Sequence, residues 1–333
     1  MGYVRYWSQV AGWLLAMFAV FEVLCRLAIS NTPEMVSDKR FGPITAPNHV
    51  QLQSNEGWAK NRTNELGNID APMPAVLPED GILVVGDSLT QGDQVPMSER
   101  YTDRAGVLLG RRIYNAGHGS WSLVNHVAFL EAELSRYKPR TIIVQVSGND
   151  LGEMWSRGQA HLQEKGTDFT IAVPYAKNSK LHELIMTRSA FVRRFVQRLR
   201  ATFFGKADAN DTAKRAQVVD SRTPRGLAYL MLRMKSHGIL PIVLYFPTLD
   251  YHRGCIDTWA EAGRLFDDAA RDAGFVFVDV TRDLCQSFAK TRQPLNGFWN
   301  TVPGEGHLNS AGHAVIAQSV ADAVRRQEAQ ARP

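Results

Sequence analysis

The chain contains five short runs of mainly β-branched and aromatic residues, separated by segments with helical periodicity. This alternation constrains the fold more than any other feature, because strands that alternate with helices form parallel sheets through right-handed crossovers. The runs are Ile82–Val85, Ile113–Asn115, Thr141–Val146, Ile239–Tyr245 and Phe275–Val280. We therefore expect an α/β domain with a mostly parallel five-stranded sheet.

A serine follows the first of these runs within the segment Gly81–Gly92, which reads Gly-Ile-Leu-Val-Val-Gly-Asp-Ser-Leu-Thr-Gln-Gly. Glycines on either side of Ser88 relax the backbone, so the turn can expose the hydroxyl as a nucleophile. The same pattern also arises where a strand ends and a helix begins, since Asp and Ser accept bonds from free helical N–H groups. Taken alone, this segment therefore fits either interpretation.

Partners for a nucleophilic serine occur further along the chain. A serine hydroxyl needs a base within hydrogen-bond reach and donors for the oxyanion. His307 is the candidate base, and the candidate donors are Asn149 and a backbone N–H within Asn115–Trp121. Ser88 and both donor segments follow predicted parallel strands, at the sheet edge where open α/β sheets bind ligands.

In this order and spacing the chain resembles the SGNH hydrolases, also called the GDSL esterase/lipase family. Gly86–Leu89 opens the domain, a glycine-rich turn follows the second strand, Gly148–Asp150 follows the third, and His307 lies near the end. The resemblance covers roughly residues 80 to 325. It implies a three-layer α/β/α, flavodoxin-like fold, and hydrolysis or transfer of acyl groups on esters without a cofactor.

Carried over to this sequence, the resemblance makes Ser88 the nucleophile and places its own backbone N–H in the oxyanion hole beside the Asn149 amide. The family usually has glycine five residues after the asparagine of its second motif, and this chain has Ser120 there. A backbone N–H can come from any residue except proline. We expect the Ser120 N–H to be the third donor, with Gly119 as the alternative.

The acid departs further from the family pattern, which places an aspartate three residues before the histidine. This chain has Gly304 at that position, and Glu305 is the nearest carboxylate. A carboxylate orients the imidazole and stabilises the imidazolium, so we expect Glu305 to complete a triad. A dyad of Ser88 and His307, with a backbone carbonyl orienting the ring, is the alternative.

The N-terminal segment is apolar enough to interact with a membrane. Residues 10–29 are just long enough to span a bilayer, with Glu22 and Arg26 at helical i,i+4 spacing. A cleaved signal peptide is the competing interpretation, with Ala28–Ser30 as the small-residue site. Because Arg26 separates the apolar core from that site, we favour an uncleaved anchor.

The charges on the two sides of residues 10–29 do not determine its orientation. We expect a single-pass protein of the inner (cytoplasmic) membrane with a periplasmic catalytic domain, because the resemblance includes exported enzymes with an N-terminal anchor. In an exported domain, Cys255–Cys285 is the only available intramolecular disulfide. Two reduced cysteines packed apart are the alternative.

Three regions follow from these assignments: an anchor over residues 1–30, a tether and extended arm over 31–80, and a catalytic domain over 81–327. Residues 151–222 form an expected helical insertion. Within it, apolar residues from Leu181 to Leu199 share one helical face, with arginines elsewhere. Packing on its own domain is the default for such a helix, and a lid or a membrane contact are alternatives.

Composition limits the remaining function classes. The 333 residues are 44% hydrophobic and 21% charged, as in a folded globular protein, and the formal net charge is +5. No nucleic-acid signature and no clustered metal-ligand set occur, so we expect neither partner.

The sequence therefore predicts an esterase that removes small acyl groups, such as acetyl, from a carbohydrate or envelope glycan. Three alternatives share the same evidence: an O-acyltransferase acting on a glycan, a lipase or lysophospholipase at the membrane, and a non-catalytic glycan-binding protein.

Overall fold

The catalytic part of the chain is built on one parallel sheet. The structure is a computed structural model that describes residues 2–27, 35–175, 188–203 and 220–330. Its central strands are β5 (Ile82–Gly86), β6 (Ile113–Gly117), β7 (Thr141–Ser147), β10 (Ile242–Phe246) and β13 (Val276–Asp279). They lie in the order β13-β10-β7-β5-β6, all parallel. This is the flavodoxin-like order, so the expected fold is confirmed.

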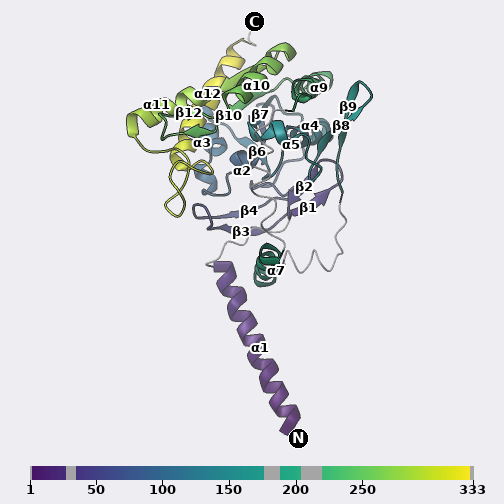
Figure 1. Ribbon diagram of the computed structural model, residues 1–333, viewed down its shortest axis with the longest axis vertical. Helices are drawn as coiled ribbons and strands as arrows, with labels where there is room; N and C mark the ends of the chain where they lie inside the picture. Colours follow the sequence, from purple (N-terminus) through teal and green to yellow (C-terminus); the bar gives the residue numbers. More distant parts are fainter. Residues whose placement is uncertain (1, 28–34, 176–187, 204–219, 331–333) are drawn as a thin grey trace.

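Helices cover both faces of this sheet (Figure 1). One face carries α4 (Leu123–Tyr137), α9 (Thr223–Ser236) and α10 (Ala260–Ala273), and the other carries α3 (Tyr101–Leu109), α11 (Thr281–Thr291) and α12 (Ser310–Gln330). Alternate residues of β5 show why: Leu83 and Val85 belong to the first core, and Ile82 and Val84 to the second. A strand buried on both faces needs apolar residues throughout, as β5 has.

Short elements at the carboxyl ends of the strands surround the site. They are α2 (Ser88–Gln91), a 3₁₀ turn η1 (Met97–Glu99), α5 (Asn149–Glu153), and the paired strands β11 (Leu249–Asp250) and β12 (Ile256–Asp257). A disulfide joins Cys255, beside β12, to Cys285 of α11, with an S–S length of 2.09 Å and a Cα–Cα distance of 5.6 Å. The expected pairing is therefore confirmed.

The segment before the sheet is more regular than its sequence suggested. It forms two antiparallel pairs, β1 (Met35–Asp38) with β2 (Gly42–Thr45) and β3 (Val50–Gln53) with β4 (Ala59–Arg62). We expected a tether with little periodicity here. Four-residue strands are too short to show alternation clearly, so pairing between them was not evident from the sequence.

The insertion also differs from expectation, because it is not helical throughout. It begins with an antiparallel hairpin of β8 (His161–Lys165) and β9 (Asp168–Ala172) and later contains α7 (Ala190–Phe203). Its residues 176–187 and 204–219 lie outside the described part of the chain, as do the apolar positions Leu181 and Leu184.

The N-terminal helix α1 (Gly2–Leu27) extends away from the catalytic domain (Figure 1). Its stretch Tyr3–Leu27 is long and apolar enough to cross a membrane. Signal sequences share this length and composition. The alternative cleavage site, Ala28–Ser30, lies outside the described residues.

Candidate active site

Ser88 begins α2 directly beyond the end of β5. The Asp87 carboxylate accepts a bond from the Leu89 N–H at 2.8 Å and so caps this short helix. The Asp87 N–H in turn donates to Gln145 Oε1 at 2.9 Å. A Cβ at Gly86 would lie 2.5 Å from that Gln145 oxygen and 2.1 Å from Thr90 Oγ1, so only glycine permits this tight turn.

His307 lies beside Ser88, although 219 residues separate the two in sequence. Its Nε2 is 2.9 Å from Ser88 Oγ. The loop before α12 holds the histidine, because the Gly297 N–H donates to the His307 carbonyl at 2.9 Å and Asn309 Oδ1 accepts from the Gly312 N–H at 3.1 Å. A serine hydroxyl in this position can transfer its proton to the imidazole.

Glu56, which the sequence analysis did not select, is the carboxylate that faces the imidazole. Its Oε2 is 2.6 Å from His307 Nδ1, and its Oε1 accepts a bond from the His307 backbone N–H at 2.6 Å. Glu305, the residue expected here, is exposed and its N–H donates to the Val302 carbonyl. The structure thus replaces both the Glu305 assignment and the backbone-carbonyl dyad with a Ser88–His307–Glu56 arrangement.

Gly306 leaves the space that Glu56 occupies. A Cβ at this position would lie 2.2 Å from Glu56 Oε1, and its φ of +74° is one that residues with side chains rarely adopt. A carboxylate can therefore approach His307 from outside the histidine loop. Gly306 is the one local sign of this approach, but it does not indicate where the carboxylate comes from.

The β3–β4 turn that carries Glu56 is fixed to the same loop. Asn300 accepts a bond from the Gly57 N–H at 2.9 Å, and its amide donates to the carbonyls of Ser54 and Gly57 at 3.0 and 3.1 Å. A Cβ at Gly57 would lie 2.4 Å from the Gln94 carbonyl. The β3–β4 turn therefore packs closely against Gln94 and against the loop that carries His307.

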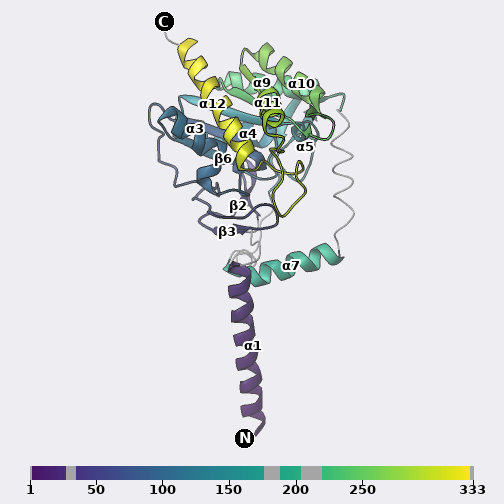
Figure 2. The same ribbon diagram turned by 90° about the vertical axis from the view of Figure 1, so that its left-hand side faces the viewer.

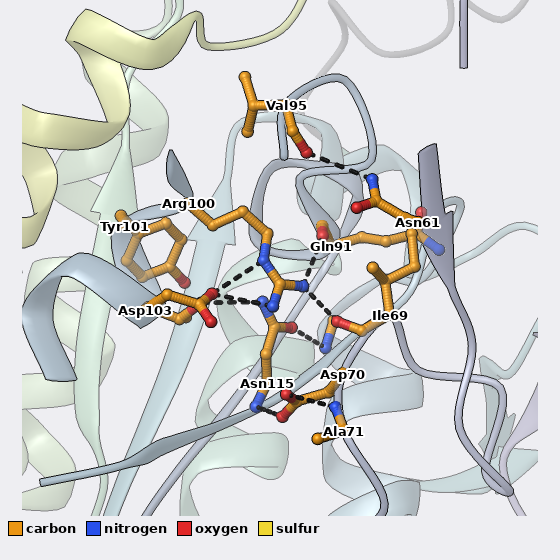
Figure 3. Close-up of polar contacts among 12 residues, drawn as sticks. Asn61, Ile69, Asp70, Ala71, Gln91, Val95, Arg100, Tyr101, Asp103 and Asn115 are labelled. Atoms are coloured by element: carbon orange, nitrogen blue, oxygen red, sulfur yellow. Dashed lines mark hydrogen bonds and ion pairs between the residues drawn. The ribbon is translucent and has the colours of Figure 1, made fainter. Parts of the chain in front are cut away.

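A buried arginine connects the rest of the arm to the turn that carries Ser88 (Figure 3). The Arg100 guanidinium donates to the carbonyls of Ile69 and Gln91, the latter at the end of α2, and pairs with Asp103 at 2.8 Å. The Asn61 amide donates to the Val95 carbonyl at 3.2 Å. These contacts make the arm part of the catalytic domain, which fixes the position of Glu56.

The charges around His307 favour its protonated form. Burial alone would lower the pKa of His307, but the hydrogen bond and charge of Glu56, with Asp93 and Asp87 nearby, outweigh it and raise the pKa above its ordinary value. Burial likewise opposes the shift at Glu56, but the bonds to His307 hold the Glu56 pKa below its ordinary value. The site is therefore built to stabilise an imidazolium facing a carboxylate.

Besides the Ser88 N–H, the candidate donors from the sequence are Gly119, Ser120 and Asn149, and a Cβ at Gly119 would lie 3.9 Å from the Ser88 Cβ. The Gly119 N–H already donates to Gln91 Oε1 at 3.0 Å, whereas Ser120 has a φ of +67° and occupies the left-handed region that glycine usually takes. Asn149 opens α5, beyond β7, and its side chain is exposed. The engagement of Gly119 favours the Ser120 N–H as the backbone donor.

The other two histidines of these motifs, His118 and His313, are buried in the interior. His118 and His313 are fully buried, and burial lowers the pKa of each to about 3, so both are neutral. His118 packs on Trp121, and the Tyr101 N–H donates to His313 Nδ1 at 3.3 Å. Within the described residues, no group of three or more His, Cys, Asp and Glu side chains could hold a metal ion.

Comparisons with known proteins found solved structures of low sequence identity. A search of curated proteins found no match. Among solved structures, TesA is 16% identical over 74% of this chain and 98% of its own, with a TM-score of 0.42. A catalytic mutant of Axe2, an acetylxylan esterase from Geobacillus stearothermophilus, is 16% identical over 75% and 96%, with a TM-score of 0.43. A lipolytic protein of the G-D-S-L family from Veillonella parvula is 13% identical over 74% and 98%, with a TM-score of 0.41.

A family model provides the stronger comparison, because it matches most of the chain. It covers residues 84–315, from the strand before Ser88 to the helix after His307. These residues contain the whole parallel sheet except the start of β5, together with the motifs that carry Ser88, Asn149 and His307. The family comprises carboxylic ester hydrolases. The chain belongs to the GDSL-like lipase/acylhydrolase family.

Proposed function

We propose that this protein is a membrane-anchored serine esterase that removes small acyl groups, most simply acetyl, from a glycan. The observation that carries the proposal is the continuous set of hydrogen bonds from Ser88 through His307 to Glu56. In this mechanism Ser88 is the nucleophile, His307 the general base and then acid, and Glu56 the carboxylate that orients the ring.

The reaction proceeds through an acyl-enzyme. Ser88 Oγ attacks the ester carbonyl while its proton passes to His307 Nε2, and the N–H groups of Ser88 and Ser120 with the Asn149 amide stabilise the oxyanion. The alcohol leaves with the proton from His307. Water then attacks the acyl carbon, His307 takes one of its protons, and the acid is released as Ser88 Oγ regains a proton.

A cavity of about 520 Å³ beside the histidine loop supports a carbohydrate substrate. Its lining includes Trp58, which is 58% exposed, and Trp299, which is 83% exposed. Exposed indole rings offer flat apolar faces on which sugar rings can stack. Gly297, whose N–H donates to the His307 carbonyl, also lines the cavity, so a glycan held here lies beside the loop that carries His307.

Acyl-chain preference tests the proposal, with the full chain purified in detergent and assayed on p-nitrophenyl acetate and p-nitrophenyl octanoate. We expect Ser88-dependent turnover that is faster on the acetate, because the proposed substrate carries a small acyl group. A strong octanoate preference would support a lipase instead. Turnover on neither ester would exclude hydrolysis and leave acyl transfer or glycan binding.

The oxyanion assignment predicts that Asn149→Ala lowers kcat on p-nitrophenyl acetate about 100-fold or more, since one preorganised donor is worth that much. KM should change little, because the bond forms mainly in the transition state. Gln163→Ala, which removes an exposed amide on the β8–β9 hairpin, is the matched control. Full activity of Asn149→Ala would remove this residue from the mechanism.

We also propose that α1 remains attached as an anchor in the inner membrane and that the catalytic domain lies on the periplasmic side. The apolar stretch Tyr3–Leu27 supports a membrane span, and the position of Arg26 between that stretch and the Ala28–Ser30 site supports its retention. The Cys255–Cys285 disulfide supports the periplasmic position, because disulfides persist in oxidising compartments.

A further inference from the structure

Helix α7 is separate from the helical layers that cover the sheet. It lies across the end of α1 that is nearer the catalytic domain, and it runs crosswise to α1 (Figure 2). The two helices pack against each other although more than 160 residues separate them in sequence. The insertion of the catalytic domain therefore reaches back to the place where the apolar N-terminal helix ends.

A carboxylate of α1 caps the N-terminus of α7. Glu22 accepts bonds from Ser189 Oγ at 2.9 Å and from the N–H groups of Ala190 and Phe191 at 3.0 and 2.9 Å, and it pairs with Arg26 at 2.6 Å. An acidic side chain near the end of an apolar helix is costly without partners. The α7 N-terminus supplies them, because free N–H groups and the helix dipole favour a negative charge there.

Aromatic side chains continue this contact along one face of α7. The Phe191 ring lies 5.5 Å from the Phe18 ring and 5.6 Å from the Phe21 ring of α1, between centroids. Phe195, one turn later, lies 6.3 Å from Phe191 and is 55% exposed, and Leu199, after another turn, is 40% exposed. Phe18 is one turn further from the catalytic domain than Glu22, so this face is directed toward the apolar part of α1.

The opposite side of α7 is directed toward the catalytic domain. Arg193 is only 2% exposed. Its charge, together with burial and Arg26, lowers the pKa of His49 in the arm to about 4, with burial the largest cause. The helix therefore has a domain-facing side with a buried arginine and an apolar side that the domain leaves uncovered.

We propose that α7 lies in the surface of a membrane rich in anionic phospholipid, with Phe191, Phe195 and Leu199 in the lipid. Its sequence, Ala-Phe-Val-Arg-Arg-Phe-Val-Gln-Arg-Leu-Arg-Ala-Thr-Phe, contains four arginines and no acidic residue. Amphipathic helices of this kind bind through apolar burial and through attraction to anionic headgroups. The inference depends on the membrane position proposed for α1, but it does not depend on ester hydrolysis.

Attachment at two places gives the catalytic domain a fixed relation to the bilayer. With α1 alone, the protein would be attached to the membrane at one place. With α7 in the surface and capped by Glu22, rotation about α1 moves α7 along the surface, whereas tilting of the domain must pull α7 out of the lipid.

Site-specific labelling of the full chain in vesicles tests this placement. Phe195→Cys, in a Cys25→Ser background, carries an environment-sensitive nitrobenzoxadiazole dye, and the vesicles contain phosphatidylcholine with about 30% phosphatidylglycerol. We expect nitroxide-labelled lipids to remove more than about half of the dye emission at this site. Leu199→Cys gives an independent measurement on the same face.

The matched control is Leu232→Cys on α9, which is 58% exposed and lies on the catalytic domain. We expect its dye to lose almost no emission. Equal, weak quenching at positions 195 and 232 would overturn the proposal, and equal quenching at position 195 in pure phosphatidylcholine would overturn the preference for anionic lipid. Repeating the labelling in Ser88→Ala separates the two proposals, since lipid contact should persist when hydrolysis is lost.

Discussion

Replacing Glu56 with alanine is expected to lower kcat on p-nitrophenyl acetate by about 10⁴-fold, whereas Glu305→Ala should change it by less than about threefold. Glu56 is the carboxylate bonded to His307 Nδ1, so its loss leaves the imidazole without the partner that fixes its orientation and stabilises its charge. Glu305 is exposed and does not contact the ring through any hydrogen bond in the described structure. The pair is matched because both glutamates lie near His307.

Glu56→Gln gives a second measurement, which a purely structural role of Glu56 would not affect. In the wild type, the pKa of His307 is raised mainly by Glu56 against the opposing effect of burial. The base must be neutral to act, so activity is lost as pH falls through that pKa. Removing the charge lowers the pKa of His307, and we expect the acidic limb of kcat/KM to move to lower pH. An unchanged limb, or full activity of Glu56→Ala, would exclude Glu56 as the acid.

Ser88→Ala is expected to lower kcat by about 10⁶-fold, and His307→Ala by a similar amount. Both residues act in the same proton transfer, because Ser88 Oγ lies 2.9 Å from His307 Nε2. Their effects should therefore not multiply, and the double variant should be about as slow as either single variant. Measurement of p-nitrophenyl acetate hydrolysis by all three variants checks this.

Ser156→Ala, at an exposed serine beyond α5, is the control for this series and should keep full turnover. Residual hydrolysis in Ser88→Ala reflects the remaining oxyanion donors. A Ser88→Ala variant with more than about a tenth of the wild-type turnover would show that the ester is cleaved by another group.

The central sheet could be predicted because its strands carry their own signal. Ile82–Val85 is apolar at every position, since the strand is buried on both faces, and the alternation with helices requires parallel pairing. The sites of Ser88 and Asn149 followed from this, because the ends of parallel strands meet at one edge. His307 was predicted from a motif that lies directly before α12 in the sequence.

Glu56 could not be found in this way, because 251 residues separate it from His307. It lies in a turn between two four-residue strands, and such strands leave almost no periodic pattern. Glu305, the carboxylate nearest to His307 in sequence, was therefore the wrong prediction for the acid. Proximity along the chain does not determine which side chain fills the space beside Gly306.

The amphipathic pattern of α7 was visible in the sequence. The sequence did not show that α7 packs against α1. Packing on the domain, closing over the site and lying on a membrane all require the same periodicity. Sequence alone determined the parallel sheet, the turn that carries Ser88 and the apolar N-terminal helix, because each depends on interactions among residues that are close along the chain. Only the tertiary structure decided that Glu56 faces His307 and that Glu22 caps α7, because these contacts form only after distant segments have packed.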